Sequence, residues 1–485
     1  MVQIQDLPIE VLSRCLSFIK WPGLPLNPFT IDTFIIPHQA MRNLMNISLV
    51  SRKFRDLAQP FLFRDLEDLS LDGTPSRFIR FLKAIIMRPQ LRKYVHSVTL
   101  HPMESDSLEK FGENLPSHDI EFFTRALQEE ALLSDMTVGF ASLLLALLLT
   151  KTPNLRMLSL CGTAFSMRPL NPLFVRDPSF LSNLEELHLE GDQQNPDYNI
   201  ATFHRLFTRP RLKLLACDSG QLEGNDIPTS WAPNTLAVEE IRLTNCDLNY
   251  NSLKRLIQTC KKLVHFIFLG WSIDNDPTDV WSSSLTLHFD EVDLIEALLP
   301  HQDTLEFLGI EFFDSHVPSR LESLEKFPGG KMPSLRDFPV LSELTIQFSL
   351  LTPRPEFPST LKRLTITNCT TSIWDMTHCI ASDCKSGRYP ELEQIIVLTV
   401  DITQLMELDK QNIPDGQTPE ECLLSLRNLF KGTKVDYQIE PYPKREDLFP
   451  MRGFMNDGFS EDDFSEGESE TEGSVDHDDR DDQLN

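Results

Sequence analysis

Few residues of this chain have the types and spacing that catalysis or metal binding requires. The nearest approach to a metal cluster is His378, Cys379 and Cys384, and their spacing fits no common zinc pattern. The twelve histidines are dispersed, and no G-x-S-x-G, P-loop or H-E-x-x-H motif is present. We therefore expect a non-catalytic protein without a metal or cofactor, whose chemistry is that of recognition.

Recognition chemistry is clearest in two apolar segments near the start of the sequence. In LPIEVLSRCLSFI, Pro8 is suited to the first position of a helix, and apolar residues then recur at the helical spacing of Ile9, Leu12, Leu16 and Ile19. The segment NISLVSRKFRDLAQPFLFRDL repeats this spacing at Ile47, Val50, Phe54 and Leu57. Two or three short helices cannot hide so much apolar surface within about 60 residues, so they indicate a docking module.

The paired segments resemble an F-box, in the style of F-box proteins from filamentous fungi. This resemblance implies that the module binds a Skp-type adaptor of a cullin-RING ubiquitin ligase, while the remainder of the chain selects a substrate. The adaptor-binding residues would be Leu7, Pro8, Ile9, Leu12, Leu16, Ile19, Leu49, Val50 and Phe54. The alternative is an ordinary helical cap on the domain that follows.

The expected module covers residues 1–70 and is interrupted by a Pro-rich insert at residues 21–40. The insert forms either a surface loop or a break that loosens the module. Residues 71–94 are expected to form a linker helix whose basic residues make a solvated face. The apolar run at residues 136–150 is shorter than the roughly 20 residues that cross a bilayer, so it predicts a buried helix.

From Val95 onward an apolar-x-x-apolar-x-apolar pattern recurs. Its copies are VHSVTL, LRMLSL, LEELHL, LKLLAC, VEEIRL, LVHFIF, LEFLGI, LSELTI, LKRLTI and LEQIIV. Between Leu155 and Leu263 the copies start 29, 28, 26 and 25 residues apart, a spacing typical of leucine-rich repeats. Amphipathic segments lie between them, so each copy predicts one strand of a parallel sheet with helices outside. A generic α/β domain is the alternative.

The order of these parts resembles F-box proteins with leucine-rich repeats. We expect an α/β protein with a helical F-box, an irregular leucine-rich-repeat solenoid at residues 95–440, and a linker and acidic tail at residues 441–485. In VEEIRLTNC and LKRLTITNC a cysteine follows the last apolar position by three residues. In many leucine-rich repeats this cysteine turns the chain out of the strand.

Strand alternation predicts which side chains face away from the core, on the concave surface of the solenoid. The candidates for a substrate surface are Glu186, His188, Arg242, His265, Ile267, Leu269, Phe307, Glu311 and Arg363. Three of them, Ile267, Leu269 and Phe307, are large and apolar. They either contact a ligand or lie beneath an inserted loop.

Charge is concentrated at the end of the sequence. The formal net charge is −27, and residues 457–485 hold 13 acidic residues and one arginine. With few aliphatic residues this tail is expected to be disordered. Its serines Ser460, Ser465 and Ser469 each precede an acidic residue by three positions, a pattern that resembles sites for an acidophilic kinase of the casein-kinase-two type. The overall acidity argues against nonspecific nucleic-acid binding.

The scattered cysteines and the absence of a cleavable leader favour a cytoplasmic or nuclear protein that is not membrane-bound. Together these features predict a substrate-recognition subunit of an SCF-type cullin-RING ubiquitin ligase. It would bind a Skp-type adaptor, through it a cullin, and an unknown protein substrate. The main alternative is an interaction scaffold outside any ligase, and a weaker one is a hydrolase on a misread α/β fold.

Overall fold

The computed structural model describes residues 7–20, 38–68, 77–100, 115–133, 139–161, 165–191, 198–222, 228, 231–272, 291–314, 331–369, 373–399, 416 and 418–441. All of these belong to one of the two units into which the chain divides, made of residues 1–23 and 36–442. Residues 21–37 of the Pro-rich insert and residues 442–485, with the three candidate phosphorylation sites, lie outside the described ranges. No helix within these ranges has the length and apolarity that crossing a bilayer requires.

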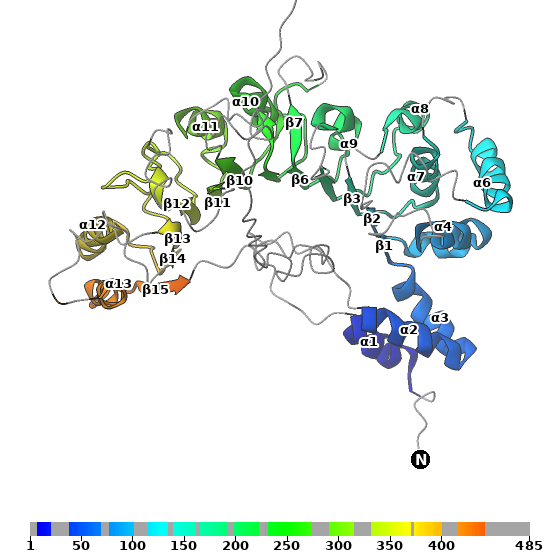
Figure 1. Cartoon of the computed structure of the whole chain (residues 1–485), viewed down its shortest axis with the longest axis horizontal. Coiled ribbons are helices and arrows are strands. Elements are labelled where there is room, and N and C mark those ends of the chain that lie inside the picture. Colours follow the sequence, from blue (N-terminus) through cyan, green and yellow to red (C-terminus); the bar gives the residue numbers. More distant parts are fainter. Residues whose placement is uncertain are drawn as a thin grey trace, which may run out of the picture. The chain divides into compact units, whose positions relative to one another are not determined.

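Helices and strands alternate along most of the chain (Figure 1). The α-helices are α1 (Ile9–Lys20), α2 (His38–Val50), α3 (Arg52–Leu62), α4 (Arg77–Met87), α6 (Ser117–Glu129), α7 (Phe140–Lys151), α8 (Asn171–Arg176), α9 (His204–Phe207), α10 (Tyr250–Thr259), α11 (Glu291–Leu298), α12 (Ile373–Lys385) and α13 (Pro419–Leu426). The 3-10 helices are η2 (Pro89–Tyr94), η3 (Arg168–Leu170), η4 (Ile200–Phe203), η6 (Leu299–His301), η8 (Phe348–Leu350) and η10 (Arg427–Phe430).

The strands form two parallel sheets. The large sheet contains β1 (Asp65–Asp68), β2 (Ser97–Leu100), β3 (Met157–Cys161), β4 (Glu186–Glu190), β6 (Leu214–Asp218), β8 (Glu240–Thr244), β10 (His265–Ser272), β11 (Phe307–Asp314), β12 (Glu343–Gln347), β13 (Arg363–Cys369), β14 (Gln394–Thr399) and β15 (Asp436–Pro441). The small sheet contains β5 (Tyr198–Asn199), β7 (Gly220–Leu222) and β9 (Asp247–Leu248).

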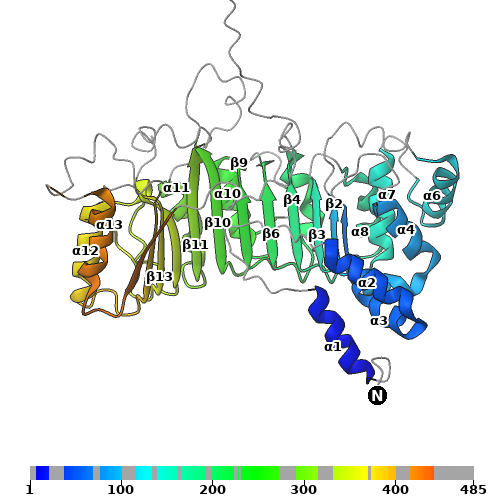
Figure 2. The same ribbon diagram turned by 60° about the horizontal axis from the view of Figure 1, so that its bottom comes forward.

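Each strand of the large sheet lies beside the one that precedes it in this sheet along the chain (Figure 2). The ten segments with the repeated apolar pattern all form strands of this sheet, as the sequence predicts. Two further strands, β1 and β15, extend it at the edges. Strand β1 falls inside the segment that we assigned to the helical module, and its four residues DLED carry one apolar side chain, Leu66. That is too few to show a pattern.

The spacing between strands varies while their register is maintained. Strand starts lie 20 residues apart between Glu343 and Arg363, and 60 apart between Ser97 and Met157. In the large sheet, the residue just before each strand up to β13 accepts two hydrogen bonds at its carbonyl. The donors are two consecutive N–H groups at the start of the next strand. These carbonyls belong to Arg64, His96, Arg156, Glu185, Lys213, Glu239, Val264, Glu306, Ser342 and Lys362. Connections of very different lengths therefore lead into the sheet with the same pair of backbone hydrogen bonds.

Alternate strand residues and the helices enclose one long hydrophobic core. On β4, for example, Leu187 and Leu189 are buried in this core while Glu186 and His188 are only half-buried. Figure 1 shows the helices from α7 to α13 on the same side of the strands. Helix α7 has nine consecutive buried residues, Ala141–Leu149, because it is apolar on all sides. The prediction of a buried helix here is confirmed.

Helices α1, α2 and α3 form a separate bundle with its own small core of Leu12, Leu16, Leu44, Phe54 and Leu57. Helix α1 begins at Ile9, one residue later than expected. Pro8 stands just before it, and the Pro8 carbonyl accepts the N–H of Leu12 at 3.1 Å. Ser51 separates α2 from α3. Its hydroxyl oxygen accepts the N–H of Phe54 at 3.2 Å, which caps the new helix.

The two TNC sequences place asparagine in the left-handed region of backbone conformation. Asn245 has φ 52° and Asn368 has φ 51°. The following Cys246 is buried, and its thiol donates to the carbonyls of Cys217 and Thr244, both at 3.3 Å. The first copy therefore leaves its strand as expected. In the second copy the strand continues to Cys369 across a shift in register, so that asparagine makes a bulge rather than an end.

Substituting Asn245 by alanine and by glycine separates its backbone and side-chain contributions. Both changes remove the hydrogen bond that its amide nitrogen donates to Asp218 at 3.3 Å. Only alanine also carries the steric cost of the left-handed conformation. We expect Asn245→Ala to unfold at a free energy about 1 kcal/mol lower than Asn245→Gly, measured by chemical denaturation. Equal stability of the two variants would contradict the left-handed turn.

Candidate docking sites on the helical bundle and the sheet

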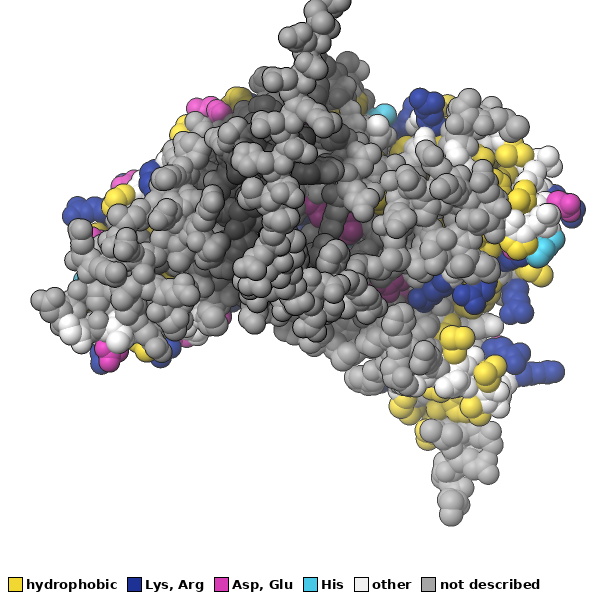
Figure 3. All heavy atoms as spheres, viewed as in Figure 1, with side chains coloured by type: hydrophobic (Ala, Val, Ile, Leu, Met, Phe, Trp, Pro, Cys, Tyr) yellow, Lys and Arg dark blue, Asp and Glu magenta, His cyan; other side chains and the backbone are white. Residues whose placement is uncertain are grey.

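The α1–α3 bundle exposes a group of large apolar side chains (Figure 3). Leu49 and Val50, at the end of α2, are 77% and 70% exposed, and Met45 one turn earlier is 55% exposed. Ile9 and Val11, at the start of α1, are 54% and 44% exposed. The remaining exposed large apolar residues of the described ranges are spread from Met87 to Leu424. The bundle therefore holds the densest such group in that part of the chain.

The two halves of this apolar group are linked by a contact between helix starts. The Lys53 ammonium donates to the carbonyl oxygen of Leu7 at 3.2 Å, so the start of α3 lies next to the start of α1. Leu49 and Val50 come just before α3, and Ile9 just after Leu7. We call Pro8, Ile9, Met45, Leu49 and Val50 the apolar docking surface. Pro8 is also exposed.

Other residues of the predicted adaptor-binding set lie inside the bundle. Leu12, Leu16 and Phe54 are buried in its core, and Leu7 is half-buried against that core. The side chain of Ile19 lies outside the described residues. Helical spacing could not separate the two groups, because the inner and outer apolar residues follow the same period. Exposure identifies Met45, which the sequence analysis did not include.

The face of the large sheet opposite the main core carries charged and polar side chains in register. Their first row runs through Glu186, Leu214, Glu240, His265, Phe307, Glu343 and Arg363. Neighbours in this row interact directly. His265 Nδ1 lies 3.4 Å from a Glu240 carboxylate oxygen, and Arg363 donates to Glu343 at 3.2 Å. Six of the nine predicted substrate-surface residues belong to this row or pair with it. Glu186, His265, Phe307 and Arg363 are in the row, Arg242 pairs with Glu240, and His188 pairs with Glu186.

Glu240 is the centre of a three-residue cluster. Arg242 donates to one of its oxygens at 2.6 Å, on the same strand, and His265 lies against the other. Burial works to raise the pKa of Glu240, but hydrogen bonds from His265 and Arg242 and the charge of Arg242 outweigh it, and the pKa is lowered. The hydrogen bond to Glu240 in turn raises the pKa of His265. Both pKa shifts favour the ionised forms of Glu240 and His265, and the His265 side chain is partly exposed for contact with a partner.

Further along the strands this face becomes buried. Ile267 and Leu269 are 2% and 3% exposed, and Glu311, Gln347 and Thr367 are buried as well. Asn368 donates to Glu311 at 3.3 Å. Half-buried His188 lies 3.6 Å from Glu186. The accessible candidates are therefore those near the strand starts, whereas Ile267, Leu269 and Glu311 do not offer open surface.

Two carboxylates occupy adjacent positions where β4 and β6 end. Glu190 and Asp218 are partners in register, and Asp218 also accepts from Ser219 at 3.0 Å and from Asn245 at 3.3 Å. Burial, together with the nearby charge of Glu190, raises the pKa of Asp218 to about 7, against the effect of these two hydrogen bonds. Near neutral pH the Asp218 carboxyl is therefore partly protonated, and the pair carries less than two full negative charges.

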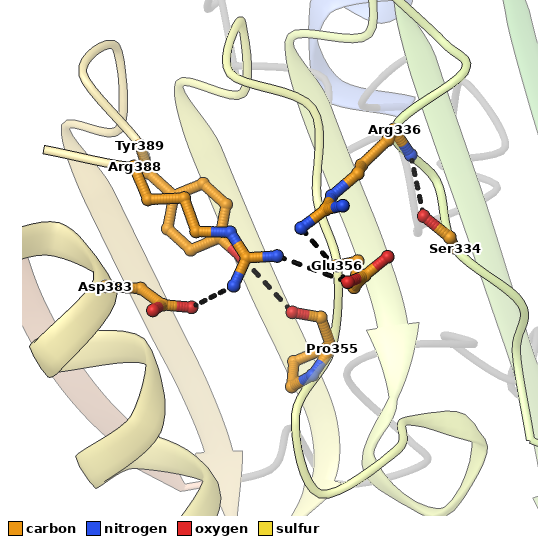
Figure 4. A network of polar contacts seen from close by, with 7 residues as sticks. All are labelled: Ser334, Arg336, Pro355, Glu356, Asp383, Arg388 and Tyr389. Atoms are coloured by element: carbon orange, nitrogen blue, oxygen red, sulfur yellow. Dashed lines mark hydrogen bonds and ion pairs between the residues drawn. The ribbon is translucent and has the colours of Figure 1, made fainter.

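A charged network that the sequence analysis missed joins three segments near β12 and β13 (Figure 4). Glu356 accepts from Arg336 at 3.0 Å and from Arg388 at 3.3 Å, and Arg388 also donates to Asp383 at 2.9 Å. The Tyr389 hydroxyl donates to the carbonyl of Pro355 at 3.1 Å. The charges alternate along the network. Its members are spread over 52 residues of the sequence, from Arg336 to Arg388. No local sequence pattern could therefore reveal it.

No protein-family model matches this chain, and no curated protein sequence matches it either. Within the described ranges, no three His, Cys, Asp or Glu residues are grouped so as to hold a metal ion. The described residues present an apolar helical surface and a charged strand face.

Removing the charge of Asp218 should change how stability depends on pH. Its folded pKa of about 7 lies above the ordinary value of 3.8, so native stability falls as pH rises from about 4 to 7 and then levels off. Asp218→Asn should therefore gain stability relative to wild type, on the order of 1–2 kcal/mol at pH 8, since each pKa unit is worth about 1.4 kcal/mol and partial exposure reduces the effect. Denaturation at pH 5 and pH 8 measures this. A variant with the same deficit or gain at both values would contradict the raised pKa.

The apolar positions of the strand face can be tested by introducing a carboxylate at two of them. Ile267→Asp should lower the free energy of unfolding by several kcal/mol, since it buries an unpaired charge. Phe307→Asp changes a half-buried residue at the edge of the same face and should cost distinctly less. Thermal and chemical denaturation compare the two. If Ile267→Asp is as stable as wild type, Ile267 is not buried in solution.

Proposed function

We propose that this protein is the substrate-recognition subunit of an SCF-type cullin-RING ubiquitin ligase, acting in the cytoplasm or nucleus. Its α1–α3 bundle serves as an F-box that binds a Skp-type adaptor and through it a cullin. Its large sheet serves as an irregular leucine-rich-repeat solenoid that binds a protein substrate. The chain supplies no covalent chemistry, and ubiquitin transfer is accelerated because the substrate is held close to the charged enzyme.

The observation that carries this proposal is the exposure of Leu49 and Val50 at the end of α2, just before the start of α3, whose Lys53 reaches the Leu7 carbonyl at the start of α1. Two neighbouring apolar side chains that are 70% or more exposed are unfavourable in water unless a partner covers them. They lie on a bundle that buries Leu12, Leu16 and Phe54 in a core of its own. A short helical bundle with its own core and an apolar outer surface fits the adaptor-binding role that the LPIEVLSRCLSFI resemblance implies.

The large sheet supports the second half of the proposal. Its strand starts present His265, Arg242 and Arg363 together with carboxylates in register. Such a row of alternating charges suits recognition of an extended or folded protein surface more than a small molecule. The uniform register keeps these side chains at fixed mutual distances. A substrate held there would be presented in one orientation.

Adaptor binding tests the proposal most directly. Leu49→Ala with Val50→Ala should weaken binding of a recombinant Skp-type adaptor at least about tenfold, because buried apolar contacts dominate interface energies. Both side chains project into solvent in the free protein, so folding should be unaffected. Isothermal titration with the full-length chain measures the affinity, and circular dichroism reports the fold.

A matched control is Val175→Ala with Leu424→Ala, two exposed apolar residues outside the bundle. This control should bind the adaptor like wild type. Leu7→Ala is a poorer probe, because Leu7 is half-buried against the core of the bundle. Removal of residues 1–66 is also unsuitable, since it would cut strand β1. Unchanged affinity in the Leu49 and Val50 variant, or no adaptor binding by wild type, would exclude the F-box role.

A further inference from the structure

Helix α4 and the 3-10 helix η2 that follows it form a strongly basic stretch of the chain. Residues 77–94 read RFIRFLKAIIMRPQLRKY, with six Lys and Arg and no Asp or Glu, in a protein whose formal charge is −27. Figure 3 shows Lys and Arg side chains gathered over α4 and the neighbouring bundle. So basic a stretch in so acidic a chain calls for a use inside the fold or outside it.

Part of this charge has a structural use. Lys83 pairs with the buried carboxylate of Asp119 on α6. Arg92 donates to the carbonyl oxygens of Ile85 at 2.9 Å and Ile86 at 3.3 Å, near the end of α4. These two residues therefore do not form the purely solvated helix face that the sequence suggested.

The remaining charge of α4 lies on one face of the helix. Successive residues of an α-helix are turned by about 100° around its axis. By this rule five residues fall within an arc of about 100°: Arg77, Arg80, Ala84, Met87 and Arg88. Arg88 follows the last residue of α4, and its N–H still bonds to the carbonyl of Ala84 at 2.9 Å, so it continues the turn. We call these five residues the basic helix face.

The arginines of the basic helix face have no partner inside the protein. Arg80 and Arg88 are exposed, Arg77 is half-buried, and Met87 beside Arg88 is 72% exposed. None of these three arginines makes an ion pair or a side-chain hydrogen bond with another residue in the described part of the chain. Like charges held on one helix face repel one another, so an anionic group that binds between them is favoured.

The surroundings of α4 argue against a membrane and against nucleic acid as this anionic partner. A basic amphipathic helix binds a membrane by inserting its apolar face, whereas the apolar face of α4 is buried in the main core. Its residues are Phe78, Ile79, Phe81, Leu82 and Ile85. Strand β1, which contacts α4, carries three carboxylates among its four residues, and a long polyanion crossing this surface would meet them.

We propose that the basic helix face docks an acidic segment of a partner protein, in which carboxylates flank an apolar residue. The carboxylates pair with the Arg80 and Arg88 guanidinium groups, which can each bind two carboxylate oxygens, and the apolar residue covers Met87. Arg80 and Arg88 are eight residues apart, about 12 Å along the helix. In a helical partner segment the matching carboxylates therefore stand about two turns apart.

Two synthetic peptides of the same composition test the proposal, each held helical by a hydrocarbon staple. In the matched peptide, glutamates stand two helical turns apart on one face with a leucine between them. In the scrambled peptide the same residues are spread around the helix, so only the overall charge is preserved. Fluorescence anisotropy with the full-length chain at about 0.1 M salt should give a dissociation constant at least about tenfold lower for the matched peptide. No adaptor is present, so the outcome is independent of the proposed function.

Variants of the basic helix face locate the contact. Arg80→Glu with Arg88→Glu should weaken binding of the matched peptide at least about tenfold, and a peptide with lysines in place of the glutamates should bind this variant instead. Met87→Ala should weaken binding about threefold, a change that charge pairing alone would not produce. The control, Arg354→Glu with Lys385→Glu, makes the same change of charge at exposed residues elsewhere and should bind like wild type. Melting temperatures confirm that all variants fold.

Failure of the matched peptide to bind at concentrations up to about 1 mM would overturn the proposal. Equal affinity for the two peptides would show attraction to charge alone, without a fitted surface. An equal loss in the two double variants would place the contact elsewhere. A double-stranded oligonucleotide or anionic vesicles might not outcompete the peptide on this surface; binding of either at least about tenfold tighter, with the same dependence on Arg80 and Arg88, would show that another class of partner is favoured.

Discussion

Every site on the large sheet depends on one recurrent backbone contact, the carbonyl that accepts two successive N–H groups at the start of the next strand. Glu239 does this for Val264 and His265, for instance. A slip of one residue would break both hydrogen bonds and turn each side chain of the strand to the opposite face. Charged residues would then enter the core and leucines would face water. The contact therefore determines that Glu240, His265 and Arg363 share one surface.

The sequence predicts the middle of the sheet well and its edges poorly, for a physical reason. Ten strands carry three apolar residues in a fixed pattern, because these side chains pack against neighbouring strands and against the helices in one core. Strand β1 has a neighbour on one edge and buries Leu66 alone, so its sequence is hardly constrained. The same limit applies to the bundle. Leu12 and Leu49 give equal signals in sequence, and only the packing of three helices shows that one is buried and the other exposed.

The chemistry of the two candidate surfaces differs because they lie on different kinds of element. The bundle exposes apolar side chains outside its small core of Leu12, Leu16, Leu44, Phe54 and Leu57. The strand face carries alternating charges, which pair with one another when no partner is present. Each surface also belongs to a separate core. Changes to one surface should therefore leave the folding of the other largely unaffected.

The strict chain order of the large sheet has a consequence for how such a protein can change over generations. Each strand contacts only the strand before it and the strand after it, and no connection has to thread between distant strands. Duplication of one strand with its following helix would insert a complete unit, joined at both sides by the same pair of hydrogen bonds. A gene could thus lengthen or shorten this strand face in single steps of one strand width, while the bundle at its beginning stays unchanged.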